Sequence, residues 1–263
     1  TLSANGQVFL VNPNGVLFAK VAQVNVGGLA ASTLGISDKD FLNGNYQFSG
    51  DSAKSVVNQG ELSAAAKGYI ALLGANVANE GVIVAKEGTA ALAAGSKVNL
   101  DFTGDGLLQM SVDKEAVAAL ASNKGLIQAY GGLVVMSAKS ADALAGTVVN
   151  NSGVIEAKSV STKNGVIRLE GCTNGSVVNS GTLNASGLEA GQTGGAMKVL
   201  GDKVSLTETS VLNASGDAAG GIILVGGNYQ GSGTEQRATE TSVAAGASLQ
   251  ADAVTSGNGG TVV

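Results

Sequence analysis

The chain has 263 residues and a formal net charge of −5, with only 13% charged and 3% aromatic residues. Soluble domains usually carry about 25% charged residues. The lysines and arginines do not cluster, which excludes a nucleic-acid-binding surface. No apolar stretch approaches the ~18 residues of a membrane-spanning helix. Forty glycines and few large side chains suit a thin, repetitive core better than a compact globule.

The cysteine and histidine content excludes two kinds of chemistry. Cys172 is the only cysteine and the chain has no histidine, so an internal disulfide and a cysteine–histidine nucleophile are both excluded. No metal-ligand or nucleotide-binding motif is present, and we expect neither a metal nor any other cofactor. The sequence starts close to a strand pattern and stops in "GGTVV", so we expect it to be part of a longer protein.

The first elements are two short apolar runs, residues 8–11 and 16–18, which flank the only proline. The connection is Asn12-Pro13-Asn14-Gly15, which has the residue preferences of a type I turn. The Asn12 side chain can bond the backbone two residues further on. The motif therefore predicts a tight turn between two strands, in which the proline loses no ladder hydrogen bond.

Two later segments have no simple strand pattern. Residues 35–52 contain three of the nine aromatic residues and predict an extra-helical loop or hairpin. Residues 101–125 begin as a turn-rich strand pair, followed by a run in which Asp113 could cap a helix and Val117, Leu120 and Ala121 share one helical face. We predict a short helix over residues 113–122, ending near Asn123.

The rest of the chain repeats. "VVNQGELSAA" from Val56 returns in related form from Asn76, Val148 and Val177, and a second apolar element alternates with it. The equivalent glycines 60 and 81 lie 21 positions apart, with no helical pattern between the strands. Three short strands and three corners in each repeat predict an all-β parallel β-helix, a solenoid.

One corner of the repeat carries a recurring asparagine. Two interpretations stay open at this point: the side chains stack in a ladder from coil to coil, or each one satisfies its own turn. The residues concerned are Asn58, Asn79, Asn151 and Asn179.

The ordered motifs resemble the haemagglutination-activity domain of filamentous haemagglutinin-like exoproteins of two-partner secretion. "NPNG" between two strands, "VGGLAAST" from Val26, "DFLNGNYQFSG" from Asp40 and "FTGDGLL" from Phe102 carry the resemblance over roughly residues 5–160. The resemblance implies a right-handed β-helix, with a secretion domain over residues 1–160 that lacks its N-terminal cap. Residues 161–263 would continue the shaft.

The resemblance also implies a function. It is a non-enzymatic secretion signal and scaffold, recognised by an outer-membrane β-barrel transporter and nucleating the folding of a secreted or cell-surface adhesin. The family has a turn at the position of Asn12, Pro13, Asn14 and Gly15. The resemblance gives these residues two alternative roles: forming the turn, or contacting the transporter directly. Host or neighbouring-cell receptors would be met by the full-length protein, which passes through the periplasm.

Two alternatives remain from the sequence. β-Helices also host polysaccharide-degrading enzymes, which need clustered acids; here the acids are scattered, and the best pair, Asp38 and Asp40, reads as a solvated loop. The parent protein could instead be a haemolysin or a contact-dependent toxin-delivery protein, whose distinguishing regions would lie beyond Val263.

Overall fold

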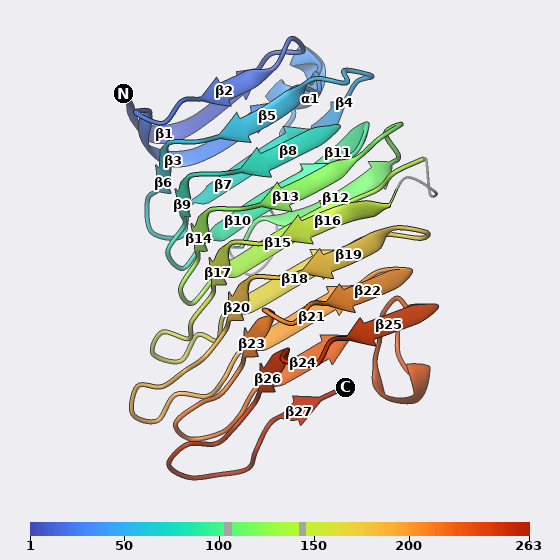
Figure 1. The fold of residues 1–263 in the computed structure, drawn as a ribbon. Helices are drawn as coiled ribbons and strands as arrows, with labels where there is room; N and C mark the ends of the chain where they lie inside the picture. The colour runs from blue at the N-terminus through green and yellow to red at the C-terminus, as the bar shows by residue number, and fades with distance from the viewer. Residues whose placement is uncertain (103–106, 142–145) are drawn as a thin grey trace.

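The computed structural model describes residues 1–102, 107–141 and 146–263, and shows a parallel β-helix (Figure 1). Each coil contributes a strand to each of three faces. Face 1 is an eight-stranded parallel sheet, formed in order by β2 (Val16–Phe18), β5 (Ser55–Asn58), β8 (Asn76–Asn79), β13 (Leu120–Asn123), β16 (Thr147–Asn151), β19 (Ser176–Asn179), β22 (Lys203–Leu206) and β25 (Glu240–Val243).

Faces 2 and 3 are joined by β3 (Gln23–Ser32), whose first half pairs with β6 and whose second half pairs with β7. β1 (Leu2–Val11) pairs with β3 along its length. Face 2 continues through β6 (Glu61–Ala64), β9 (Val82–Val84), β14 (Leu126–Gln128), β17 (Val154–Glu156), β20 (Thr182–Asn184), β23 (Val211–Asn213) and β26 (Ser248–Gln250). Face 3 continues through β7 (Tyr69–Gly74), β10 (Thr89–Ala94), β15 (Leu133–Ala138), β18 (Val166–Glu170), β21 (Ala196–Leu200), β24 (Ile222–Val225) and β27 (Thr261–Val262).

The core follows from strand alternation, since every second side chain points into the coil. In-register pairing places equivalent residues above one another, about 4.8 Å apart. On face 2 the fully buried column consists of Leu62, Ile83, Ile127, Ile155, Leu183 and Leu212. Columns of this kind replace the bulky three-dimensional core of a globule, which explains why so few aromatic residues suffice.

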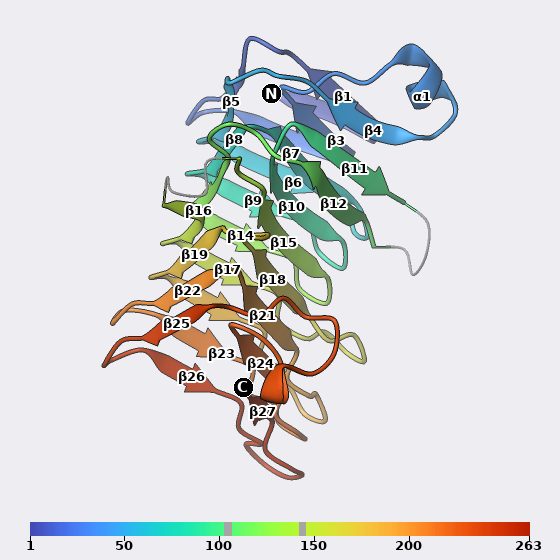
Figure 2. The same ribbon diagram turned by 90° about the vertical axis from the view of Figure 1, so that its right-hand side faces the viewer.

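A second apolar cluster lies outside the solenoid, between face 3 and an antiparallel sheet of three strands. Both sides of β7 and β10 are buried, whereas β18 alternates between buried and partly exposed residues. Phe48 of the antiparallel sheet is fully buried in this cluster. The covering strands, seen beside face 3 in Figure 2, are β4 (Tyr46–Ser49), β11 (Lys97–Asp101) and β12 (Gln109–Lys114).

The extra-helical hairpins are as predicted, but the predicted helix over residues 113–122 is wrong. Asp113 and Lys114 belong to β12, and Ala121 in β13 pairs with Val77 and Val149 on face 1. Pairing with β11 and burial of Ala121 outweigh a helix propensity of a few tenths of a kcal/mol per residue. Residues 103–106 of the Phe102–Leu108 motif lie outside the described residues.

The α-helix lies in the earlier interruption instead. α1 (Asp38–Leu42) begins after Ser37, whose hydroxyl oxygen accepts a hydrogen bond from the backbone N–H of Asp40 at 3.1 Å. A short 3-10 turn, η1 (Tyr229–Gly231), lies in the long loop after β24. Among the described residues, no helix has the length and apolar character needed to cross a membrane.

One column of glycines allows neighbouring coils to approach at the corner between faces 1 and 2. A Cβ on Gly153 would lie 2.2 Å from the carbonyl oxygen of Gly125 in the coil before. We therefore expect Gly153→Ala to lower the free energy of unfolding by about 1–3 kcal/mol, because backbone must shift. Urea denaturation measures this, with Gly6→Ala as control, since nothing lies within 4 Å of that position. Equal stability of the two variants would contradict the packing argument.

Candidate functional site: the amino-terminal turn and the asparagine ladder

The turn between β1 and β2 has the predicted local geometry. The N–H of Gly15 donates to the carbonyl oxygen of Asn12 at 3.1 Å, and the N–H of Asn14 donates to Asn12 Oδ1 at 3.0 Å. Gly15 has φ +109°, which an L side chain adopts only with strain. The Ser52 hydroxyl donates to the carbonyl oxygen of Pro13 at 2.6 Å and ties the turn to the next coil.

The turn lies on an open surface. Asn12, Pro13 and Asn14 are exposed, and the Asn14 side chain makes no hydrogen bond within the described part of the chain. Strand β2 is the first strand of face 1, and β1 pairs only with β3, so both present an outer edge without a partner among the described strands. Leu17 and Val21 add apolar surface there, at 64% and 90% exposed. Unpaired edges of this kind are able to accept a further strand.

The four predicted asparagines lie in one buried column on face 1 and are fully inaccessible to solvent. Each side-chain amide except that of Asn179 donates to the side-chain oxygen of the asparagine in the following coil, and the Asn179 amide donates to the carbonyl oxygen of Gly181. The Nδ2–Oδ1 distances are 2.8 Å from Asn58 to Asn79, 2.8 Å from Asn79 to Asn123, 2.8 Å from Asn123 to Asn151, and 2.7 Å from Asn151 to Asn179.

Sequence reasoning missed Asn123, the central member of this asparagine ladder. The incorrect helix assignment over residues 113–122 hid it as a helix terminus. The pattern that could have found it is Asn-x-Gly, which Asn123 shares with Asn58 and the other ladder positions. The ladder ends where apolar residues take the asparagine position: Phe18 pairs opposite Asn58, and Leu206 opposite Asn179.

Corner length changes at the same two places. In the ladder coils two residues separate the strands, as Gln59 and Gly60 do between β5 and β6. In the coils without asparagine the connection has four residues, closed by a backbone bond such as Ala22 N to Ala19 O at 2.8 Å or Ser210 N to Thr207 O at 3.0 Å. The asparagine thus accompanies a tight corner, in which its side chain replaces the missing turn hydrogen bond.

The two predicted site groups do not meet. The turn at residues 12–15 precedes β2, whereas the asparagine corner follows the face 1 strands at their other end. The ladder asparagines are buried and have no access to a partner. Any recognition by this site therefore falls to the turn and the exposed strands beside it.

The acids of the enzyme alternative do not form a catalytic pair in the described structure. Asp40 lies in the first turn of α1, where hydrogen bonds from Ser37 and Asn45 lower the pKa of its carboxyl group. Burial raises the pKa of the Cys172 thiol, which keeps it protonated. Within the described ranges, no group of three or more His, Cys, Asp or Glu residues could hold a metal ion.

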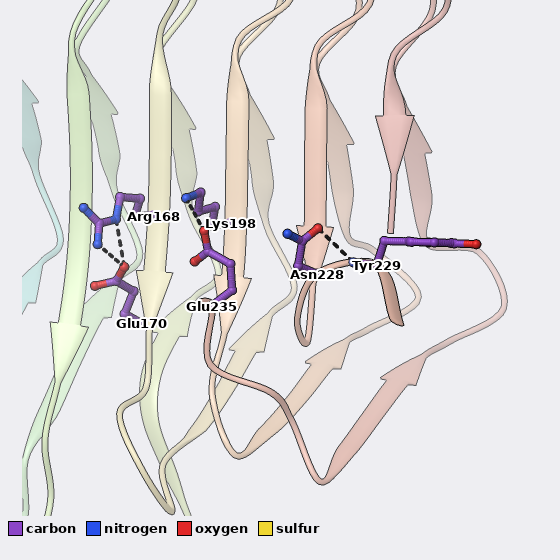
Figure 3. A network of polar contacts seen from close by, with 6 residues as sticks. All are labelled: Arg168, Glu170, Lys198, Asn228, Tyr229 and Glu235. Atoms are coloured by element: carbon purple, nitrogen blue, oxygen red, sulfur yellow. Dashed lines mark hydrogen bonds and ion pairs between the residues drawn. The ribbon is translucent and has the colours of Figure 1, made fainter. Parts of the chain in front are cut away.

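Charged side chains do line the outer side of face 3 beyond the antiparallel sheet (Figure 3). Arg168 donates through Nε to Glu170 at 2.7 Å, and Lys198 of β21 reaches Glu235 of the loop after β24 at 2.7 Å. These pairs are partly exposed, so each contributes on the order of 0–1 kcal/mol. The Lys198–Glu235 pair fixes the loop against the face, whereas Arg168 and Glu170 both belong to β18.

A tighter polar cluster follows face 2. Tyr130 donates to the Glu156 carboxylate at 2.5 Å, Gln128 donates to the same carboxylate at 2.9 Å, and Lys158 pairs with it at 2.9 Å. Burial alone would raise the pKa of Glu156, but these three hydrogen bonds outweigh it and lower the pKa. Burial, together with the hydrogen bond to Glu156, raises the pKa of Tyr130 to about 12. The carboxylate stays ionised and the phenol stays protonated at neutral pH.

Comparison with known proteins gives the class. The family model of the TPS secretion domain matches residues 1–185, which end just after the last ladder corner. The chain therefore belongs to the secretion domains of two-partner secretion, a family of non-enzymatic export domains of exoproteins that cross the outer membrane.

Individual relatives give a more specific comparison than the family model. A solved structure of the HMW1 secretion domain from Haemophilus influenzae matches with a TM-score of 0.83 and 32% identity, over 97% of this chain and 74% of that one. Two heme/hemopexin-binding proteins of Haemophilus influenzae are 37% identical over 64% of the chain and 29% identical over 87% of it. The chain spans 19% and 27% of their lengths.

The ladder predicts a loss of stability when one of its members is removed. Asn151→Ala removes the acceptor of Asn123 Nδ2 and the donor to Asn179 Oδ1, and each buried group left without a partner costs about 1–3 kcal/mol. Asn58→Ala, at the ladder start, leaves Asn79 Oδ1 without its side-chain donor and the Gly60 N–H without its acceptor, so its cost should be of similar size. Denaturant unfolding compares both with Asn25→Ala, an exposed control on β3. Equal losses for Asn151→Ala and the control would contradict a cooperative ladder.

The Glu156 cluster predicts a pH dependence. Because the pKa of Glu156 is lower in the folded chain, its stabilising contribution is present above the unfolded pKa of about 4.3 and lost as pH falls through the folded value. We expect Glu156→Gln to lower stability at pH 7 and to lose less stability than wild type on acidification to about pH 3. Thermal unfolding across this range measures the difference, and parallel curves would refute the assignment.

Proposed function

We propose that this chain is the secretion signal and folding scaffold of a large adhesin-type exoprotein, recognised by its outer-membrane β-barrel transporter. The observation that carries the proposal is the family match over residues 1–185, together with the fold shared with the HMW1 secretion domain. The protein would cross the periplasm and reach the cell surface or the medium. Any receptor would be met by parts of the exoprotein outside this chain.

Transporter contact would fall on the first coil. The exposed turn at residues 12–15 is held rigid by its own hydrogen bonds and by Ser52, so its binding surface is already ordered. The free outer edges of β1 and β2 lie beside it. An extended partner segment could add to such an edge by main-chain hydrogen bonds, which is a general mode of peptide recognition. The Asn14 side chain is the best candidate for contact, because it makes no hydrogen bond that holds the turn together.

The same domain would start the folding of the rod. Each coil supplies a row of backbone donors and acceptors for the next, so growth from an existing coil avoids the cost of a new nucleus. The first coils also carry the second apolar cluster under the antiparallel sheet, which gives them stabilising contacts that later coils lack. We therefore assign recognition and nucleation to residues 1–160, and shaft extension to residues 161–263.

Heme ligation is not part of the proposal, although two relatives bear the name heme/hemopexin-binding protein. Those proteins extend far beyond the part that aligns with this chain. The present sequence has no histidine, the residue that holds heme iron in globins and peroxidases. We likewise propose no enzymatic activity.

Partner-dependent secretion tests the proposal. The chain, placed in its exoprotein, is expressed with and without the cognate transporter, and the protein in the medium is quantified. Asn14→Ala should reduce export about fivefold, as expected for the loss of one hydrogen bond of ~1 kcal/mol, without changing the unfolding free energy. The control Asn25→Ala should export normally.

Two outcomes separate the parts of the proposal. Export without the transporter would overturn the secretion-signal function altogether. Normal export of Asn14→Ala would move recognition away from the turn and leave the family function intact.

A further inference from the structure

A cavity lies on the outer side of the solenoid, at the corner where face 2 strands turn toward face 3. It has a volume of about 450 Å³, within the range of small-molecule sites. Its lining comes from successive coils and from the loop after β20. Half of it lies beyond residue 185, where the family match ends, so secretion does not account for it. The principal polar lining residues are Tyr130, Lys158, Asn184, Glu189, Gln192 and Asn213.

The floor of this groove holds two planar polar side chains, Asn184 and Asn213. They belong to one outward column in strict register, whose preceding members Glu156 and Gln128 lie outside the lining. Strand pairing places Glu156 opposite Asn184, and Asn184 opposite Asn213, with Gln128 one coil before them. Their spacing is therefore the strand spacing of about 4.8 Å. A ligand lying along the rod would meet one polar group per coil.

The two asparagines of this column are oriented by the backbone. Asn184 Oδ1 accepts from the N–H of Ser186 at 3.0 Å, and Asn213 Oδ1 accepts from the N–H of Ser215 at 2.8 Å. With the oxygens held inward, each Nδ2 group is left to donate outward, and neither makes a hydrogen bond within the described part of the chain. Two fixed donors therefore face the groove, and the Glu189 carboxylate of the lining is an acceptor.

One wall of the groove is also preorganised. The loop after β20 is tied to the next coil by the N–H of Gly191, which donates to Asp217 Oδ2 at 2.7 Å, and by Gln192, whose backbone oxygen accepts from Ala218 at 2.9 Å. Leu188 is 58% exposed on this loop. Across the groove lies the Tyr130 ring, with Lys158 Nζ 5.4 Å from its centroid. Apolar contacts thus accompany the polar floor, at little entropic cost on binding.

From this groove we infer a binding site for a neutral oligosaccharide chain lying along the rod. Sugar hydroxyl groups both donate and accept, which matches alternating amide donors and a carboxylate acceptor. The C–H faces of a sugar ring suit the Tyr130 ring and Leu188. The charged lining residues are Lys158 and Glu189; Lys158 is already paired with Glu156, which leaves the Glu189 carboxylate uncompensated, so an anionic glycan is disfavoured.

Isothermal titration calorimetry at pH 7 tests the inference with cellopentaose, maltopentaose, mannopentaose and chitopentaose as probes. At least one probe should bind with a stoichiometry near one, and a galacturonate pentamer should bind more weakly. If no neutral probe binds, or if the acidic probe binds best, the inference is overturned.

Two isosteric variants locate the site. Asn184→Asp and Asn213→Asp keep the oxygen that accepts the backbone N–H but replace the outward donor with a carboxylate oxygen, and each should weaken binding about tenfold. Asn25→Asp is the matched control, because Asn25 lies in the same outward column, joined to it through Ser63 and Val84. It should bind as wild type. Undiminished binding by both groove variants would place the glycan elsewhere and refute the site.

Discussion

The amide-to-amide hydrogen bond from coil to coil is the constraint on which the middle of this molecule depends. A side chain such as Asn123 can donate to Asn151 and accept from Asn79 only if three consecutive coils keep one register. In-register stacking then places glycine over glycine at the adjoining corner, where no Cβ fits. The two-residue corner, the asparagine and the glycine therefore form a single structural unit. The tight corner requires both residues.

The side chains on the outer surfaces are apolar or polar according to whether other strands cover them. Where β7 and β10 carry apolar residues on both sides, the antiparallel strands β4, β11 and β12 lie over them. Where β18 and β21 carry Arg168 and Lys198 instead, the face is solvated and only one loop is fixed to it. The chain thus uses one solenoid to present a covered apolar end and a polar shaft, and secretion and ligand binding are assigned to different stretches of that surface.

The sequence was sufficient to predict what repeats. The recurrence of short alternating strands with glycine corners predicted the β-helix, and it placed four of the five ladder asparagines at one corner while leaving open whether they stack. The aromatic residues 41, 46 and 48 marked the extra-helical segment. Asn123 escaped because Asp113 to Ala121 has a helix-like pattern, and only the long-range partners β11 and β8 decide against it.

The groove that we propose as a glycan site could not be predicted from the sequence for a similar reason. Asn184 and Asn213 lie 29 positions apart, and their alignment depends on a register that local patterns do not reveal. The loop that carries Leu188 adds to the difficulty, because the loop at this place in the preceding coil has a different sequence.

The asparagine ladder has a direction. Every amide in it donates toward the carboxyl-terminal coils, while Asn58 Oδ1 at its start is already satisfied by the N–H of Gly60 and Asn179 Nδ2 at its end turns to the carbonyl oxygen of Gly181. The aligned amide dipoles add up along the rod axis, so the two ends of the ladder are electrostatically distinct. In the proposed assembly from the first coils onward, the growing end of the ladder would expose N–H donors, and a new ladder coil would have to bring a carbonyl oxygen to the matching position.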